Sequence, residues 1–353
     1  MKNPFSISFG RVPNEYIRRS QEKEKILELF TELPVTDQLY VLLGVRGSGK
    51  TVTMTDLCED FEKLKNWIVV KISPVENILD ALYQILYHDP RVHAPQTDAS
   101  MALSLPMLSI SMNEKAPAEN TTKAIDNILS ALEKKGLNVL VAIDEVTNTE
   151  QMRAFISAFQ IFVTNRRPIF FLATALFEEM EALRDVRNLT FLYLAPRLIL
   201  SQLDIRAMAS TYQRVFGYSK AQCLKLAKAT NGYSLAFQIL GYVSWEHKDA
   251  GILSEEILEE YDQKLAELAY GKLWMELSET DQRVMLAIAK SKSHSVKDIR
   301  SIAEMDANKF NQYRRRLKER GLIDVRTYGE IRFYLPRFRE FLETEVFEAF
   351  DLT

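Results

Sequence analysis

Short, continuous apolar runs alternate with longer amphipathic stretches over the first 200 residues of the chain. Runs of this kind are typical of strands that are buried on both faces of a parallel sheet. We expect such strands at 39–43, 67–73, 137–145, 168–174 and 190–194. The periodic stretches between them predict helices at 16–33, 52–64, 75–87, 121–135, 151–165 and 176–184. This alternation predicts an α/β core whose parallel sheet is covered by helices on both faces.

One stretch, residues 89–120, interrupts this alternation and is rich in Pro, Ser, Ala and Asn. Within it, residues 101–112 alternate apolar and small polar positions with a period of two, which is equally compatible with an inserted β-hairpin and with a mobile loop. The helix that follows is expected to be capped by Thr121 or Thr122 and to end at Gly136.

Strand patterns are absent after about residue 200, where four helical stretches are separated by Gly217, Gly232 and Gly251. From about residue 275 the pattern changes to three short helices, and two alternating segments around residues 328–330 then indicate a hairpin. We therefore predict three parts: an α/β core, a helical lid and a small C-terminal domain, over residues 1–200, 201–273 and 274–353.

The first candidate site is the sequence GVRGSGKT at residues 44–51, which fits the G-x-x-x-x-G-K-[ST] motif completely and follows an expected strand. Glycines let the backbone curl so that successive N–H groups point at a phosphate, and the helix N-terminus that follows favours an anion. We expect Lys50 to reach the β- and γ-phosphates and the Thr51 hydroxyl to hold Mg²⁺. The residues predicted to bind ATP here are Gly44, Gly47, Ser48, Gly49, Lys50, Thr51 and Val52.

Polar residues at the ends of two later strands complete this site. Asp144 and Glu145 follow the apolar strand VLVAI, which places them at the same sheet edge as the motif. We expect Asp144 to anchor Mg²⁺ and Glu145 to orient or deprotonate the attacking water. Thr174 ends the next strand, where it is equally suited to touch the γ-phosphate or to cap the helix at 176–184.

These residues resemble the AAA+ class of P-loop ATPases. Within that class, the chain is similar to the archaeal-type group that includes the origin-recognition initiators and grades into the STAND switch ATPases. The resemblance is carried by the 44–51 motif, by Ile143-Asp144-Glu145, and by the segments at 9–26 and 231–245. It implies a P-loop core, a helical lid and a C-terminal winged helix, with ATP and Mg²⁺ as ligands. It also implies that Arg19 lies near the adenine.

The chain departs from that pattern in the lid and near the fifth strand. Many AAA+ proteins carry an arginine in the lid, and STAND-like ones carry Gly-Tyr-Pro, whereas this chain has Gly232-Tyr233-Ser234 and no basic residue before Trp245. An arginine finger is expected near the fifth strand, where the candidates stand outside any convincing motif: Arg184, Arg187 and Arg197. Without a finger we expect slow turnover.

The C-terminal pattern of three helices and a β-ribbon is that of a winged helix, a variant of the helix-turn-helix reader of duplex DNA. Residues 296–340 carry twelve basic and seven acidic side chains, a net +5 in a chain whose net charge is −3. Such local basicity is what duplex binding requires and favours it, although a winged helix can also serve protein contact. The predicted DNA contacts are Lys309, Arg314, Arg315, Arg316 and Arg332.

The remaining composition restricts the class of protein. The near-neutral total charge argues against a polycation that coats nucleic acid, and the two cysteines, Cys58 and Cys223, fit no metal spacing, so we expect buried free thiols. The longest strongly apolar stretch, residues 169–177, is about half of the ~20 residues that a membrane helix needs. The first residues lack the apolar core of a secretion signal, so we expect a cytoplasmic protein with no membrane partner.

The sequence is therefore compatible with two functions. The leading hypothesis is a Mg²⁺-dependent ATPase whose nucleotide state is coupled to binding of double-stranded DNA. The alternative is a STAND-type switch that acts on a protein partner or on further copies of itself, without DNA. A kinase is disfavoured because the sequence shows no second substrate pocket and no lid arginine cluster.

Overall fold

The computed structural model describes residues 2–8, 12–93, 118–186, 192 and 195–347. The chain divides into two compact units. The sheet unit contains residues 20–43 and 51–199, and the helical unit contains residues 1–19, 44–50 and 200–353. Across the described ranges, no helix combines the length and the apolar character needed to cross a membrane.

Five parallel strands form the centre of the sheet unit, in the order β2-β3-β4-β1-β5. Their bounds are β1 Leu39–Leu43, β2 Trp67–Ile72, β3 Asn138–Ile143, β4 Ile169–Ala175 and β5 Arg197–Ile199. Every residue of β1 and β4 is buried, as expected for strands that are covered on both faces. The predicted parallel α/β sheet is confirmed.

The fifth strand differs from the prediction. Residues 190–194, where we expected it, lie outside the described residues apart from Leu192, which is not in a strand. The strand that pairs with β1 is instead the short segment β5, in which Leu198 is half-buried and the other two residues are exposed. The hairpin expected at 101–112 also lies outside the described residues.

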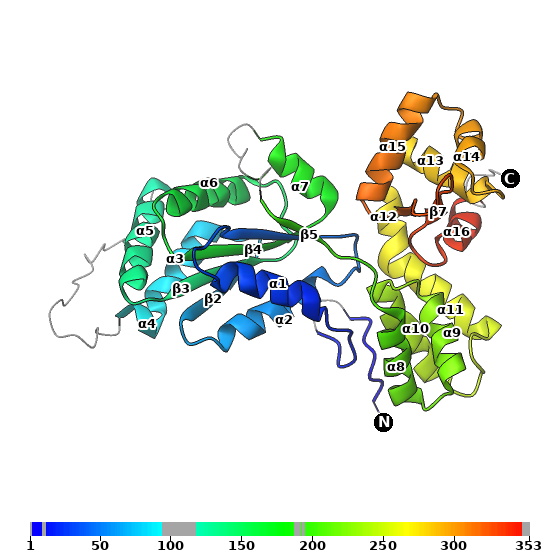
Figure 1. Ribbon diagram of the computed structural model, residues 1–353, viewed down its shortest axis with the longest axis horizontal. Coiled ribbons are helices and arrows are strands. Elements are labelled where there is room, and N and C mark those ends of the chain that lie inside the picture. The colour runs from blue at the N-terminus through cyan, green and yellow to red at the C-terminus, as the bar shows by residue number, and fades with distance from the viewer. Residues whose placement is uncertain (1, 9–11, 94–117, 187–191, 193–194, 348–353) are drawn as a thin grey trace. The chain divides into compact units, whose positions relative to one another are not determined.

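Helices cover both faces of this sheet (Figure 1). Buried side chains of α1 (Ser20–Thr31) and α2 (Lys50–Glu62) pack on one face, around Tyr40, Leu140 and Phe170. On the other face a second core includes residues of α3, α5, α6 and α7. These helices and the short α4 span Ile78–His88, Ala118–Lys134, Glu150–Thr164, Phe177–Arg184 and Pro90–His93.

The predicted start of α5 is wrong, whereas its end is confirmed. The helix begins at Ala118, so Thr121 and Thr122 lie inside its first turns rather than at the cap. Ala118 and Glu119 are good helix formers, and the Thr121 hydroxyl donates to Asp80 Oδ1, 3.3 Å away, instead of capping the backbone. Gly136 follows the helix with a φ of +65°, a conformation that favours glycine and ends the helix.

In the helical unit, four helices occupy the stretches expected after residue 200: α8 Ile205–Phe216, α9 Lys220–Ala229, α10 Ser234–Glu246 and α11 Glu255–Leu265. Asp204, Ser219 and Ser254 cap α8, α9 and α11 with their side chains. A π-helical turn, η2 (Ala266–Tyr270), and α12 (Gly271–Met275) continue the chain.

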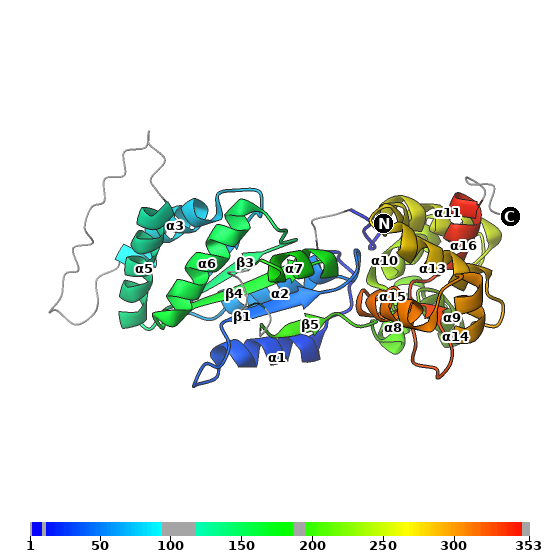
Figure 2. The ribbon, with the colours of Figure 1, turned by 90° about the horizontal axis from the view of Figure 1, so that it is seen from above.

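The C-terminal segment forms three helices and a two-stranded antiparallel sheet, at the places that the sequence indicates. The elements are α13 Glu279–Lys290, α14 Val296–Ile302, α15 Ala307–Glu319, β6 Ile323–Asp324, β7 Arg332–Phe333, α16 Phe338–Phe341 and η3 Leu342–Phe347. Helix α13 lies against both α14 and α15 (Figure 2). Buried residues of this segment share one core with α8–α12 and with Phe5 and Val45.

Candidate nucleotide site

The phosphate loop, residues 44–50, belongs to the helical unit and ends where α2 begins. Two of its glycines are required by the backbone, because Gly47 and Gly49 have φ values of +75° and +93°. Space is a second requirement: a Cβ on Gly47 would lie 2.4 Å from the Tyr233 hydroxyl oxygen, and one on Gly49 would lie 3.2 Å from Ser234 Oγ. A side chain at residue 47 is therefore excluded by both conformation and packing.

Lys50 is buried, and its ammonium donates to the carbonyl oxygens of Gly44 and Val45, at 2.9 and 3.0 Å. Ser48 is also buried, and its hydroxyl makes no hydrogen bond to any described residue. A buried cation and an unsatisfied buried hydroxyl in a glycine-rich loop are a chemical fit for a phosphate group, which needs both positive charge and donors.

Arg19 lies against this loop. Its side chain is buried, and Nη2 donates to the carbonyl oxygens of Ser48, at 3.2 Å, and Ser201, at 2.7 Å. The resemblance placed this residue near the adenine, but the contacts described for it are with backbone carbonyls of the helical unit. Arg19 therefore holds the phosphate loop in position.

Two residues that the sequence did not assign to the site also hold the loop. Tyr233, which is fully buried, donates its hydroxyl to the Arg46 carbonyl at 2.5 Å, and the Leu235 N–H donates to the Gly47 carbonyl at 3.0 Å. Both lie where the segment Gly232-Tyr233-Ser234 enters α10. In the sequence, the signal for this segment was that Gly232-Tyr233-Ser234 differs from the Gly-Tyr-Pro of the STAND-like proteins that the chain resembles.

A carboxylate cluster lies in the sheet unit, at the carboxyl ends of β3 and β4. The Thr51 hydroxyl donates to Asp144 Oδ2 at 2.8 Å, and the Thr174 hydroxyl donates to Asp144 Oδ1 at 2.5 Å. Thr174 also accepts a hydrogen bond from the Glu145 N–H, at 2.9 Å. Sequence reasoning selected all four residues, and the structure brings them together.

The two interpretations of Thr174 can now be compared. Helix α7 is capped by Leu176 without a side-chain hydrogen bond, so the capping alternative is wrong. Thr174 is fully buried within β4, and its hydroxyl is engaged by Asp144 and by the Glu145 N–H. It therefore orients the two acidic residues.

Glu145 occupies the left-handed backbone region, with a φ of +52°, and its side chain is exposed to solvent. Non-glycine residues in this region are uncommon and are often held there at functional sites. Here the hydrogen bond from its N–H to Thr174 holds the turn.

Thr51 and Asp144 supply the oxygen donors that Mg²⁺ prefers. Among the described residues, no three His, Cys, Asp or Glu side chains gather as a ligand set for a metal. A cation here would therefore be held by this one hydroxyl, this one carboxylate, phosphate oxygens and water, which is the usual coordination of Mg²⁺ in phosphoryl-transfer sites.

Of the three candidate finger arginines, Arg187 lies outside the described residues. Arg184 ends α7 and Arg197 begins β5. Burial and the positive charge of Arg184 lower the pKa of Arg197, while Glu181 acts in the opposite direction.

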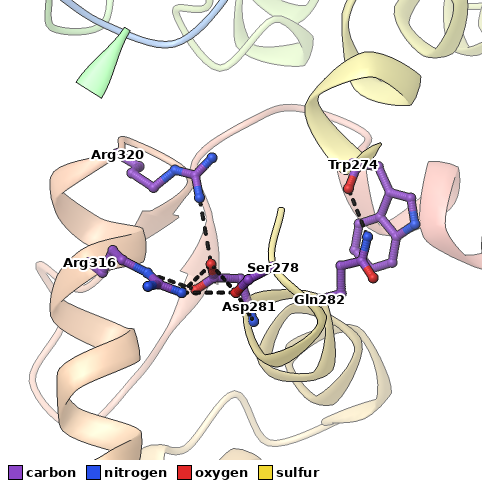
Figure 3. Close-up of polar contacts among 6 residues, drawn as sticks. All are labelled: Trp274, Ser278, Asp281, Gln282, Arg316 and Arg320. Atoms are coloured by element: carbon purple, nitrogen blue, oxygen red, sulfur yellow. Dashed lines mark hydrogen bonds and ion pairs between the residues drawn. The ribbon is translucent and has the colours of Figure 1, made fainter. Parts of the chain in front are cut away.

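The predicted DNA contacts divide into two groups. Arg316 is bound within the domain: Nε donates to Asp281 Oδ1 at 3.1 Å, and Nη2 donates to the Ser278 hydroxyl at 3.0 Å and to Asp281 Oδ2 (Figure 3). Arg320 approaches the same carboxylate at 3.6 Å, and Asp281 is only 1% exposed. Arg316 therefore joins α15 to the start of α13.

Arg332 and its neighbour on the ribbon are paired as well. Arg332 contacts Glu330 at 3.0 Å, and Arg326 forms an ion pair with Asp324 at 2.5 Å. In contrast, the structure shows no ion pair to a described residue for Lys309, Arg314, Arg315 or Lys318 of α15. These four side chains can therefore meet an external anion without first breaking an ion pair to a described residue.

Residues 267–342 match a family described as a domain of unknown function, DUF8462. No match to a curated protein was found. The chain is similar in structure to the Walker-type ATPase PABY2304 of Pyrococcus abyssi, with 14% identity, a TM-score of 0.65, and coverage of 94% of this chain and 96% of that one.

It is also similar to the Aeropyrum pernix ORC2 protein, solved as ADPNP–ADP complexes, with 14% identity, a TM-score of 0.57 and coverage of 98% of each chain. At this identity the similarity concerns the fold. The parallel sheet, the phosphate loop before α2 and the helices that follow the sheet agree with it. The chain therefore has the fold of the AAA+ ATPases, as the resemblance in its sequence implies.

Proposed function

We propose that this protein binds and hydrolyses Mg²⁺-ATP, and that its nucleotide state is coupled to binding of double-stranded DNA by the C-terminal domain. The observation that supports ATP binding and hydrolysis is the carboxylate cluster. In this cluster Asp144 accepts hydrogen bonds from Thr174 and from Thr51, the residue that directly follows the phosphate loop. A motif threonine that donates to an acid at the carboxyl end of another parallel strand of the same sheet supports a role in phosphoryl transfer.

In this proposal the phosphate loop and Thr51, which are consecutive in the 44–51 motif, bind the phosphates and the Mg²⁺ of one nucleotide. The N–H groups of Gly47, Ser48 and Gly49 cradle the phosphates, and Lys50 exchanges its carbonyl partners for phosphate oxygens. Thr51 and Asp144 hold Mg²⁺, which supplies charge neutralisation at the β- and γ-phosphates when bound.

Glu145 is proposed to accept the proton of the attacking water as that water adds to the γ-phosphorus and the bond to the β-phosphate oxygen breaks. Its exposed carboxylate and its fixed backbone suit this role. Thr174 positions both acidic residues through its hydrogen bonds to the Asp144 carboxylate and the Glu145 N–H, and does not touch the nucleotide.

Coupling to DNA rests on the order of α13, α14, α15, β6 and β7, which supports a winged helix, and on the unpaired cations of α15. Lys309, Arg315 and Lys318 are exposed, and Arg314 is half-buried. We propose that these side chains contact the phosphates of a duplex, since such contacts need positive charge and no exact base geometry.

A specific observation favours the alternative, a nucleotide switch that acts on a protein partner. Arg316, Arg326 and Arg332 are already paired with Asp281, Asp324 and Glu330, which reduces the positive potential of the domain. The fully exposed Tyr328 at the hairpin turn is also a side chain typical of protein contacts.

Steady-state ATP hydrolysis with and without a duplex tests the proposal. We expect turnover that requires Mg²⁺, is stimulated by the duplex, and falls at least about 100-fold in Glu145→Gln, which should still bind ATP. Tight ATP binding with negligible turnover in the unsubstituted protein would instead favour the switch. Failure to bind ATP would refute the proposal.

Duplex binding is measured separately by fluorescence anisotropy. Replacing Arg314 and Arg315 with Ala should weaken binding and reduce its dependence on salt. The matched control replaces Lys220 and Lys225, two exposed cations of α9, and should leave binding unchanged. Equal affinity of both variants would contradict the proposed DNA surface.

A further inference from the structure

Every peptide carbonyl of the phosphate loop from Gly44 to Ser48 accepts a hydrogen bond. Lys50 holds the first two, Gly44 and Val45. The next three are held from elsewhere in the helical unit: Arg46 by the Tyr233 hydroxyl, Gly47 by the Leu235 N–H, and Ser48 by Arg19. The loop is therefore fixed at each of five consecutive peptide groups.

Holding a carbonyl also orients an N–H. A trans peptide group is planar, so the carbonyl of one residue and the N–H of the next point in opposite directions. The hydrogen bond to Arg46 consequently sets the direction of the Gly47 N–H, and the one to Gly47 sets that of the Ser48 N–H. The Gly47 N–H belongs to the set that cradles phosphates in loops of this motif, whereas the Ser48 N–H donates to the Val45 carbonyl, 3.2 Å away.

Tyr233 itself has little freedom to move. Its side chain is almost completely buried, and burial raises the pKa of its phenol, so the hydroxyl remains protonated and able to donate. Its ring stacks on that of Tyr270, with ring centroids 6.5 Å apart and planes 20° from parallel. The absence of a side chain on Gly47 leaves the space that the hydroxyl occupies.

We propose that Tyr233 is a positioning residue for nucleotide binding, which presets the phosphate-binding amides of the loop through the Arg46 carbonyl. The proposal rests on the proposed function, since it presumes that the loop binds ATP. It also assigns a role to the Gly232-Tyr233-Ser234 segment, which carries no charge with which to sense a phosphate directly.

The test compares Tyr233→Phe with Tyr212→Phe in the full chain. Tyr212 is a matched control, because it is also a fully buried tyrosine of the helical unit whose hydroxyl donates to a backbone carbonyl, that of Phe237 at 2.8 Å, but it does not contact the loop. Isothermal titration with Mg²⁺-ADP and Mg²⁺-ATP gives the affinity, and thermal unfolding gives the stability of each variant.

We expect Tyr233→Phe to bind both nucleotides about 3- to 10-fold more weakly, the effect of one lost hydrogen bond, and Tyr212→Phe to bind within twofold of the unsubstituted protein. In steady-state hydrolysis the loss should appear in KM with kcat nearly unchanged, because the oriented amides bind ground state and transition state alike. A purely structural role would lower the unfolding temperature of both variants and leave KM unchanged.

A second pair of variants tests the neighbouring hydrogen bond if Tyr233→Phe does not fold. Leu235→Pro removes the N–H in the first turn of α10, where proline is tolerated, and Leu235→Ala retains it. We expect weaker nucleotide binding in the proline variant than in the alanine variant.

The possible failures can be distinguished. Equal affinity of Tyr233→Phe and the unsubstituted protein, or an equal loss in Tyr212→Phe, would overturn the positioning role and leave the proposed ATPase intact. If the unsubstituted protein bound neither nucleotide, the proposed function would fail, and this inference with it.

Discussion

The Tyr270 hydroxyl donates a hydrogen bond to the Pro336 carbonyl, 2.6 Å away, and both residues are buried. Tyr270 belongs to η2, whereas Pro336 follows β7, so this contact connects the turn after α11 to the end of the two-stranded sheet. The Tyr270 ring also packs edge-on against Phe338, with centroids 5.0 Å apart.

Removing this hydroxyl should destabilise the helical unit. In Tyr270→Phe the buried Pro336 carbonyl loses its donor, which costs about 1–3 kcal/mol, and the unfolding midpoint in urea should fall. Tyr261→Phe is the control, because the hydrogen bond of Tyr261 to Ala229 is long, at 3.4 Å, and should cost less. Equal midpoints for the two variants would contradict the importance of the Tyr270–Pro336 contact.

The buried carboxylate of Asp281 should contribute more to the stability of the helical unit than an exposed ion pair does. It is buried and binds Arg316 and Arg320, so Asp281→Ala leaves two arginines without this partner. Breaking a buried pair costs about 3–5 kcal/mol, and we expect about 2 kcal/mol here because Arg316 remains partly exposed. Glu330→Gln, at an exposed pair, should cost less than about 1 kcal/mol. Urea unfolding of both variants measures the difference.

Thr174→Val should separate ATP binding from hydrolysis. The substitution keeps the shape of the side chain but leaves the Glu145 N–H and one Asp144 oxygen without the hydroxyl that holds them. We expect kcat to fall at least about tenfold while ATP still binds. Thr164→Val, at the exposed end of α6, is the control and should hydrolyse ATP normally. Normal kcat in Thr174→Val would show that Thr174 does not position the acids.

The contact between α10 and α11 should weaken as pH rises. Hydrogen bonding to Glu260, supported by the charges of Glu256 and Glu260, raises the pKa of His247, against a smaller opposing effect of burial. A raised pKa means that the stabilisation is fully present below the ordinary histidine value of about 6.5 and is lost as pH rises through the higher folded-state value. Lys264 also faces this carboxylate, with its ammonium 3.2 Å from Glu260 Oε1.

Thermal unfolding between pH 5.5 and 8.5 measures this effect. We expect a decrease in the unfolding temperature above neutral pH that is reduced in His247→Gln. An identical pH profile for the variant would exclude His247 as its source.

Neither cysteine should react with a thiol reagent in the native protein. Both thiols are buried, and burial raises the pKa of Cys58 to about 12, so the reactive thiolate is scarce near neutral pH. Ellman's reagent at pH 8 should detect two thiols only after unfolding. Rapid modification of the folded chain would contradict the burial of Cys58 and Cys223.

The strands and most helices could be predicted from the sequence because local patterns specify them. β1 has the predicted bounds, and α13 begins at Glu279, close to the predicted change of pattern at about residue 275. β5 was missed because its three residues are too few to show a strand pattern of their own, and two of them are exposed; pairing with β1 makes them a strand. Tertiary contacts decide such short edge segments.

The site shows the same limit. Asp144, Glu145 and Thr174 could be selected because each ends an apolar run, and strand ends meet at one edge of a parallel sheet. The role of Tyr233 could not be predicted, because its partner Arg46 lies 187 residues earlier in the chain. Nor could the pairing of Arg316 with Asp281, which turns an apparent DNA contact into a brace between two helices.

The helical unit is assembled from three separate stretches of the chain, 1–19, 44–50 and 200–353. Phe5 packs against Tyr212 and Phe237, and the phosphate loop depends on Tyr233 and Leu235, all of which follow residue 200. During synthesis, the loop therefore leaves the ribosome long before the residues that shape it. Since domains fold as units as the chain emerges, we expect a nascent chain that ends near residue 200 to carry the complete motif and still bind ATP poorly.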